Sequence, residues 1–259
     1  MTSSAVSDPA ARRRRLANSF GQAADSYDRF RPDYPADAVA AAVDGAHRVL
    51  DLGAGTGKLT RLLSAAGARQ VWAVEPDRQM LAVLAAATPD AIVLGGFAEQ
   101  IPLPDAAVEV VVVGQALHWF DLDTALPEIA RVLRPGGRLT CLWNTSDTRD
   151  PFTAQWVQAL DTTVRPHGGA TGQTAAAESV PEAPFVGNAH FADPALQLVD
   201  WSHRMSADEL HGLADTYSYV LTAEPSSREA LHRQLAELIG MRPDVAIAER
   251  CQVWTAVRL

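Results

Sequence analysis

Short apolar runs alternate with Ala- and Leu-rich stretches between residues 47 and 143. This alternation is typical of a parallel sheet covered by helices, because strands buried on both faces are continuously apolar. We expect strands at Arg48–Asp51, Gln70–Val74, Ile92–Leu94, Val108–Val113 and Arg138–Trp143. The helices between them are expected at Lys58–Ala66, Arg78–Ala87 and Thr124–Leu133, each followed by a breaker: Gly67, Pro89 or Pro135-Gly136-Gly137. The fold class is therefore α/β.

The flanking segments predict a cap before this sheet and further elements after it. Residues 1–46 contain two Tyr-centred turns that lead into an Ala-rich helix, and we expect them to form an N-terminal helical cap. Residues 47–259 are expected to form one domain, in which 150–195 is a substrate-side helix followed by a flexible loop or lid at 167–184. The last elements are expected at Leu196–Arg204 (strand), Ala207–Tyr217 and Ser226–Gly240 (helices) and Ala246–Val257 (strand).

The composition of the chain limits the classes of partner that we expect it to bind. The 259 residues carry a formal net charge of −9, which disfavours a nucleic acid as the main ligand. No stretch approaches the roughly 20 apolar residues of a membrane span, and the two cysteines have no zinc-binding spacing, so no metal is expected. We expect a cytoplasmic protein that acts on a small molecule.

The most informative segment runs from Val49 to Lys58 and joins an apolar strand to three glycines. A phosphate-binding P-loop needs four residues between its glycines, whereas Gly53 and Gly57 enclose three. A dinucleotide fingerprint needs its third glycine one residue later, where Lys58 stands. A ligand without phosphate and with an amino-acid end suits the glycines and Asp51, which can neutralise an ammonium group. A tight strand-to-helix turn without a ligand is the simpler alternative.

The pattern Asp51-x-Gly53-x-Gly55-x-Gly57 resembles the first motif of class I S-adenosylmethionine-dependent methyltransferases. Glu75 follows the second strand, residues 95–104 are similar to the family's adenine-edge motif, and residues 133–139 are similar to its late structural motif. The resemblance implies a Rossmann-like, doubly wound sheet of seven mostly parallel strands, with helices on both faces and an antiparallel last strand.

The same resemblance implies the cofactor, S-adenosyl-L-methionine, and its site. Glu75 would accept hydrogen bonds from the ribose hydroxyls. Arg31 would bind the methionyl carboxylate or an acidic substrate, unless its segment is only a surface helix that packs through Tyr27 and Phe30. Met80 either walls the adenine or belongs to the core, and Phe97 departs from the Asp that is frequent in the family. The implied cofactor-binding residues are Asp51, Gly53, Ala54, Gly55, Thr56, Gly57, Glu75, Pro76, Met80, Ala98, Glu99, Gln115, Tyr27 and Arg31.

The fourth strand leads into Gln115-Ala-Leu-His118-Trp119-Phe120, at the edge of the sheet where ligands bind. This segment lacks the Asn/Asp-Pro-Pro-aromatic motif of nucleobase and amide methylases and looks like the small-molecule subgroup that includes the trans-aconitate type. His118 is the candidate catalytic residue, as a base or an orienting group, unless it only shapes the cofactor pocket. Tyr34, Trp119 and Trp143 are the candidate substrate residues.

These observations favour methyl transfer to a small organic acceptor, with O-methylation of a hydroxyl or carboxylate preferred. A protein that binds the same cofactor for another purpose, such as a cyclisation, is the main alternative. A nicotinamide dehydrogenase ranks third, and a methylase of nucleic acids or proteins ranks last because of the charge and the missing motif.

Overall fold

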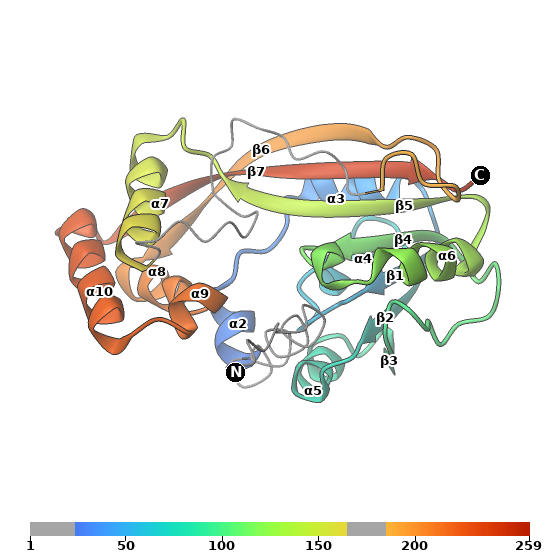
Figure 1. Ribbon diagram of the computed structural model, residues 1–259, viewed down its shortest axis with the longest axis horizontal. Helices are drawn as coiled ribbons and strands as arrows, with labels where there is room; N and C mark the ends of the chain where they lie inside the picture. Colours follow the sequence, from blue (N-terminus) through green and yellow to red (C-terminus); the bar gives the residue numbers. More distant parts are fainter. Residues whose placement is uncertain (1–23, 165–184) are drawn as a thin grey trace, which may run out of the picture.

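The computed structural model describes residues 24–164 and 185–259, and its centre is one twisted sheet of seven strands (Figure 1). Residues 1–23 of the expected cap and the expected loop 167–184 lie outside the described residues. The strands follow the order β3-β2-β1-β4-β5-β7-β6. Their bounds are β1 Arg48–Leu52, β2 Gln70–Glu75, β3 Ile92–Gly95, β4 Val108–Gly114, β5 Leu133–Ser146, β6 Ala195–Ser206 and β7 Asp244–Val257.

The strand directions confirm the expected fold class. Neighbours from β3 to β5 pair in parallel, whereas β7, the last strand of the chain, is antiparallel to both β5 and β6. The described helices are α2 Ala24–Phe30, α3 Ala36–Val43, α4 Thr60–Leu63, α5 Arg78–Ala87, the 3-10 helix η1 Leu117–Trp119, α6 Leu122–Val132, α7 Pro151–Val164, α8 Ala207–Ala214, α9 Ser218–Leu221 and α10 Pro225–Ile239.

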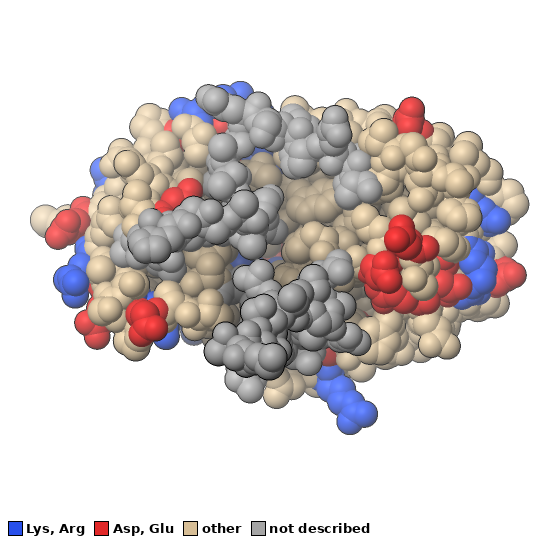
Figure 2. Space-filling view, viewed as in Figure 1, with Lys and Arg blue, Asp and Glu red and all other residues tan. Residues whose placement is uncertain are grey.

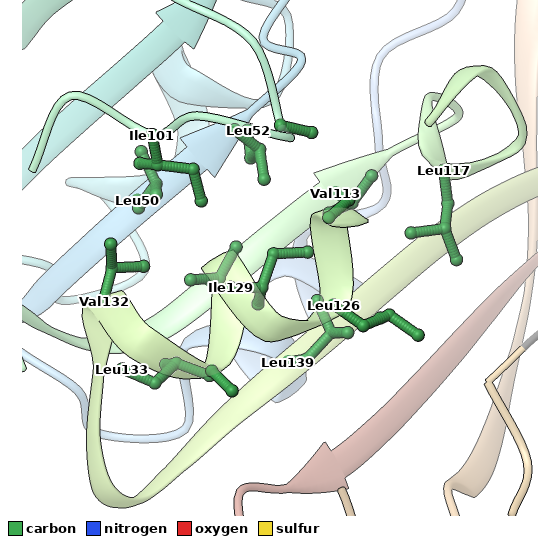
Figure 3. Packing of buried hydrophobic residues seen from close by; sticks show 14 of the residues in the cluster. Leu50, Leu52, Ile101, Val113, Leu117, Leu126, Ile129, Val132, Leu133 and Leu139 are labelled. Atoms are coloured by element: carbon green, nitrogen blue, oxygen red, sulfur yellow. The ribbon is translucent and has the colours of Figure 1, made fainter. Parts of the chain in front are cut away.

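Two apolar layers cover the two faces of the sheet. Alternate side chains of a strand point to opposite faces, so Leu50 packs on the α6 side while Val49 packs on the α3 side. On the α6 side, Leu126 and Ile129 interlock with the sheet (Figure 3). This burial holds the carboxyl ends of β1, β2, β4 and β5 along one edge.

Strands β5, β6 and β7 continue past the other strands and carry a helical lobe, formed by α7 to α10 (Figure 1). The lobe has its own apolar core, which includes Trp156, Leu210 and Leu231 and is closed by Val245 and Ile247 of β7. The sequence predicted most of these helices as separate elements but did not predict that they gather in one lobe.

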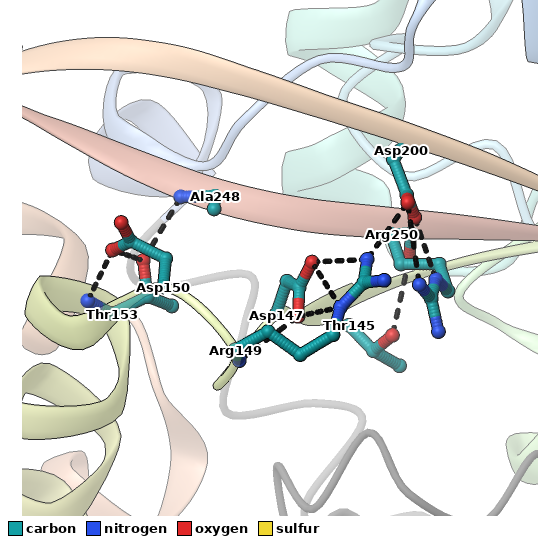
Figure 4. A network of polar contacts seen from close by, with 8 residues as sticks. All are labelled: Thr145, Asp147, Arg149, Asp150, Thr153, Asp200, Ala248 and Arg250. Carbon is teal, nitrogen blue, oxygen red and sulfur yellow. Dashed lines mark hydrogen bonds and ion pairs between the residues drawn. The ribbon is translucent and has the colours of Figure 1, made fainter.

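Polar contacts fix the lobe to the long strands (Figure 4). The Arg149 guanidinium donates to Asp147 at the end of β5 and, at 2.7 Å, to Asp200 on β6. The backbone N–H of Ala248 on β7 donates to Thr153 Oγ1 on α7 at 2.9 Å. These bonds connect α7 with β7, and the segment before α7 with β6.

Three local predictions differ from the structure. The helix expected at Lys58–Ala66 is regular only over Thr60–Leu63, although Leu59 and Ser64 keep helical backbone angles. The turn expected at Pro135-Gly136-Gly137 lies inside β5 as an irregularity, because β5 begins directly after α6 and its register shifts there.

The prediction of one helix over Ala207–Tyr217 is also wrong. Helix α8 ends at Ala214, and the Thr216 hydroxyl donates to the Leu213 carbonyl at 2.7 Å in the turn that precedes α9. A hydroxyl that bonds a nearby carbonyl gives the backbone an alternative to the helical ladder. The resulting turn places Thr216 and Tyr217 against α2.

Candidate functional site

A small cleft, with a cavity volume of about 60 Å³, opens at the carboxyl edge of the sheet, where α2, the glycine loop and the ends of β4 and β5 meet. Its lining residues are Tyr27, Arg31, Pro32, Tyr34, Asp51, Gly53, Ala54, Gly55, Thr56, Lys58, Leu59, Gly114, Gln115 and Asn144.

The glycine loop brings backbone, without side chains, to the floor of this cleft. The N–H groups of Gly53 and Ala54 donate to the Val74 carbonyl at 2.9 and 3.1 Å, which holds the loop against β2. A Cβ at Gly53 would lie 2.9 Å from the Cβ of Ala116, whereas one at Gly55 would meet only the Met80 sulfur, at 3.9 Å. Close packing therefore fixes the loop at Gly53, and space remains above Gly55.

Two buried carboxyl groups support the loop from below. Asp51 is 1% exposed, and its Oδ2 accepts from the Thr60 hydroxyl at 2.6 Å. Glu75 accepts from the N–H groups of Gly55 and Asp77 at 2.9 and 2.8 Å. Burial raises the pKa of each carboxyl to about 7. A ligand that supplies hydrogen-bond donors would therefore favour the ionised form of both carboxyl groups.

Arg31 places a cation on the α2 side of the cleft. Its guanidinium lies 4.1 Å from the centre of the Tyr217 ring, and its Nη2 donates to the Thr216 carbonyl at 3.2 Å. Its Nε is buried without a hydrogen-bond partner, and no carboxylate of the described chain forms an ion pair with it. An unpaired guanidinium of this kind is suited to a carboxylate ligand.

Tyr34, Gln115 and Asn144 also line the cleft. The Tyr34 hydroxyl packs on the backbone of Gly114, where a Cβ would lie 2.5 Å from it. Gln115 has a φ of +57°, and its Nε2 donates to the Asn144 carbonyl at 3.0 Å. A positive φ at a residue other than glycine is strained and is retained mostly at functional sites. The Oδ1 of Asn144 is buried without a partner.

The structure brings together only part of the predicted site. Asp51, Gly53, Ala54, Gly55, Thr56, Gln115, Tyr27, Arg31 and the predicted substrate residue Tyr34 line the cleft. The other predicted residues do not line it: Gly57, Glu75, Pro76, Met80, Ala98, Glu99, His118, Trp119 and Trp143.

Several residues of the second group have contacts that explain their position. Glu99 accepts from the backbone N–H of Asp121 at 2.8 Å and thereby holds the start of α6. Ala98 and Trp143 pack in the apolar layer on the α6 side, and Met80 is buried on α5. Their roles in ligand binding stay predictions.

His118 lies on η1, directly after β4, with its ring centre 4.5 Å from that of Trp119. The surrounding protein lowers the pKa of His118 to about 4, although the residue itself is exposed. The imidazole is therefore neutral at pH 7, and its pKa lies well below the value that suits a base at that pH.

Sequence reasoning missed Asn144, Lys58 and Pro32 as cleft residues. Asn144 follows the apolar part of the fifth strand, and this position at a carboxyl end was the available signal. Lys58 forms an ion pair with Asp33 at 3.1 Å, which ties the loop to the segment after α2. Only the three-dimensional contact between these two segments reveals that role.

Asp and Glu side chains gather over α6 in Figure 2, which makes that end of the face unsuited to a polyanion. Among the described helices, none is long and apolar enough to cross a membrane.

Comparisons with known proteins identify the family of the chain. Residues 50–141 match the family model of a methyltransferase domain. An uncharacterized methyltransferase of Mycobacterium tuberculosis is 39% identical over 235 residues, which cover 90% of each chain. An uncharacterized methyltransferase of Schizosaccharomyces pombe is 31% identical over 233 residues and covers 88% of this chain and 90% of its own.

A solved structure shares the fold. A protein described as a type II methyltransferase, from Anaeromyxobacter dehalogenans, superposes with a TM-score of 0.63 at 23% identity and covers 88% of this chain and 97% of its own. The sheet order, the glycine loop and these relatives lead to one conclusion. The chain belongs to the class I S-adenosylmethionine-dependent methyltransferases.

Proposed function

We propose that the cleft binds S-adenosyl-L-methionine and that the protein transfers its methyl group to a small organic acceptor, with O-methylation preferred. The observation that carries this proposal is the Arg31 guanidinium, which has no ion-pair partner among the described residues and shares one cleft with buried Asp51 and the glycine loop. A cation for a carboxylate and an anion for an ammonium match the two charges of an amino-acid end. The subgroup resemblance to the trans-aconitate type stays a prediction.

The described residues fit this cofactor. Arg31 would hold the methionyl carboxylate and Asp51 the ammonium, and Gly55 lies on the wall of the same cleft. Each oxygen of Glu75 that bonds a backbone N–H keeps a further lone pair for a ribose hydroxyl. Thr56 Oγ1, which is buried without a hydrogen-bond partner, adds a free polar atom on the same wall.

When bound, the cofactor supplies a methyl group on a sulfonium, which is a good leaving group. The contribution of the chain is then mainly proximity and alignment, worth up to roughly 7–11 kcal/mol in favourable cases. Gln115, Tyr34 and Arg31 all line the cleft and would share this alignment.

An acceptor screen with methyl-labelled cofactor tests this proposal. We expect labelled product and stoichiometric S-adenosylhomocysteine with at least one small hydroxyl or carboxylate compound. Tight cofactor binding without label transfer to any class of acceptor would instead favour a protein that uses the cofactor without methylating.

Binding of S-adenosylhomocysteine should release protons. The free carboxyls of Asp51 and Glu75 have pKa values of about 7, so each is roughly half protonated at pH 7. Donors of the ligand favour the ionised forms and lower both pKa values, so we expect release of about one proton at pH 7 and almost none at pH 9. Calorimetry in two buffers of different ionisation enthalpy measures this number.

Asp51→Asn is the matched variant for this measurement, because it keeps the shape of the side chain and removes its titrating carboxyl group. It should cut the proton release by about half at pH 7. Proton uptake in the unmodified protein, or equal release in the variant, would contradict the assignment of these two carboxyls.

His118 should orient groups near the cleft and should not act as the main base. With its pKa lowered by desolvation, the ring is neutral throughout pH 6–9, so His118→Asn should lower kcat by less than about tenfold without changing the shape of the pH profile. A variant that loses a pH-dependent limb of kcat between pH 6 and 9 would restore His118 as the base.

A further inference from the structure

One face of the paired strands β6 and β7 crosses from the lobe to the main domain. Residues opposite each other in an antiparallel pair, and residues two apart in one strand, share a face. On this face Met205, Val245 and Ile247 belong to the lobe core, whereas Val199, Cys251 and Val253 pack in the layer beneath α3. The stretch between these two cores is therefore the part of the face that spans the junction.

Trp201, His203 and Glu249 occupy this junction. Trp201 pairs with Glu249 in the register, and the rings of Trp201 and His203 lie 5.1 Å apart. Glu249 is 6% exposed, and its Oε1 lies 3.7 Å from His203 Nε2. Three polar groups thus replace the apolar residues that precede and follow them along both strands.

Each of the three side chains keeps a buried polar atom that has no hydrogen-bond partner within residues 24–164 and 185–259: Trp201 Nε1, His203 Nε2 and Glu249 Oε2. A buried carboxylate oxygen and a buried indole N–H both cost stability when they are unpaired. Three such atoms in one cluster are rare in a native protein and require an explanation. A ligand that binds at this place supplies one, because it would pair groups that the protein leaves open.

The cluster continues the wall of the cleft. In the register of β5 and β7, Asn144 pairs with Cys251 and Ser146 pairs with Glu249. Asn144 lines the cleft, and Glu249 shares its face one step further toward the lobe. The unpaired atoms therefore lie beside the cofactor cleft, on the side where the lobe meets the main domain.

We propose that Trp201, His203 and Glu249 form the acceptor subsite and select a neutral acceptor that offers a hydroxyl or amine hydrogen. This inference rests on the proposed function and narrows it. The free oxygen of Glu249 accepts a donor and repels a carboxylate, whereas the indole N–H of Trp201 donates to an oxygen of the acceptor. Alcohols, phenols and arylamines can make both of these contacts, and carboxylic acids cannot.

The test follows the indole N–H resonance of Trp201 by NMR in protein saturated with S-adenosylhomocysteine, assigned with Trp201→Phe. Phenol, benzyl alcohol, aniline and benzoate are the probes, titrated separately at pH 7.5. We expect at least one of the three neutral probes to shift this resonance to saturation, and benzoate to leave it unchanged. A response to benzoate, or to none of the neutral probes, would overturn the proposal.

Two variants separate binding from folding. Glu249→Gln should weaken the binding of the responding probe roughly tenfold, as expected for loss of a charged hydrogen-bond acceptor. The Tm should be unchanged or raised, because the variant removes a buried charge that lacks a full set of partners. Trp254→Phe is the control, since Trp254 lies on the opposite face and its indole already donates to Gln252 at 3.2 Å. It should leave probe affinity unchanged.

A lower Tm in Glu249→Gln together with unchanged probe affinity would show a purely structural role and overturn the subsite. The affinity for S-adenosylhomocysteine, measured on the same samples, distinguishes failure of the acceptor subsite from failure of the proposed function. Normal cofactor binding with no neutral probe bound would overturn the subsite alone, whereas loss of cofactor binding in the unmodified protein would overturn the proposed function.

Discussion

Arg31→Met should weaken the binding of S-adenosylhomocysteine roughly 10- to 100-fold, the range expected for loss of a hydrogen-bonded charge pair. Arg31 lines the cleft, and its buried Nε is unpaired, so a ligand carboxylate would be its first ionic partner among the described residues. Methionine keeps an apolar contact with the Tyr217 ring and removes the charge. Calorimetric titration measures the change in Kd.

A ligand-side control makes this test specific. Adenosine lacks the amino-acid end, so Arg31→Met should bind it as the unmodified protein does. Arg138→Met is the protein-side control, because Arg138 bonds the backbone at Val43 and Asp44 and does not line the cleft. An equal loss of affinity for adenosine would show that Arg31 only supports the fold of the cleft.

Gly57→Ala should lower the free energy of unfolding by about 2–4 kcal/mol, which corresponds to a fall in Tm of roughly 5–15 °C. Gly57 has a φ of +91°, and a Cβ there would lie 2.7 Å from Leu84 Cδ1 and 3.1 Å from Thr88 Cγ2. The variant combines backbone strain with a steric clash against α5. Thermal and urea unfolding measure the loss.

Gly67→Ala separates the two causes. Gly67 has a similar φ of +107° but nothing within 4 Å of its Cβ position, so this variant should show only the backbone cost. The difference between the two decreases in the free energy of unfolding is the cost of the clash with Leu84 and Thr88. Equal losses would mean that α5 moves aside freely, and the loop would then lack its packing support.

The parts of the site that sequence predicted well are local. Asp51 and the glycine loop lie within a few residues of one another, so their spacing alone fixes a strand, a turn and the start of a helix. The strand directions followed from the alternation of apolar runs with helical segments, and the family resemblance added the antiparallel last strand. Local spacing also placed Gln115 at the end of β4, where its strained backbone turns into the cleft.

The parts that it could not predict depend on contacts between distant segments. Backbone N–H groups of Gly55 and Asp77 donate to Glu75, and that of Asp121 donates to Glu99; the sequence predicted none of these contacts. The cluster of Trp201, His203 and Glu249 exists only through the register of β6 and β7. Such a register is set by burial along the whole strand and cannot be deduced from either segment alone.

A calorimetric titration of the protein with S-adenosylhomocysteine and, separately, with NAD decides which cofactor the cleft binds. We expect one site for S-adenosylhomocysteine, with proton release at pH 7, and no measurable binding of NAD. Binding of NAD in the absence of S-adenosylhomocysteine binding would contradict it.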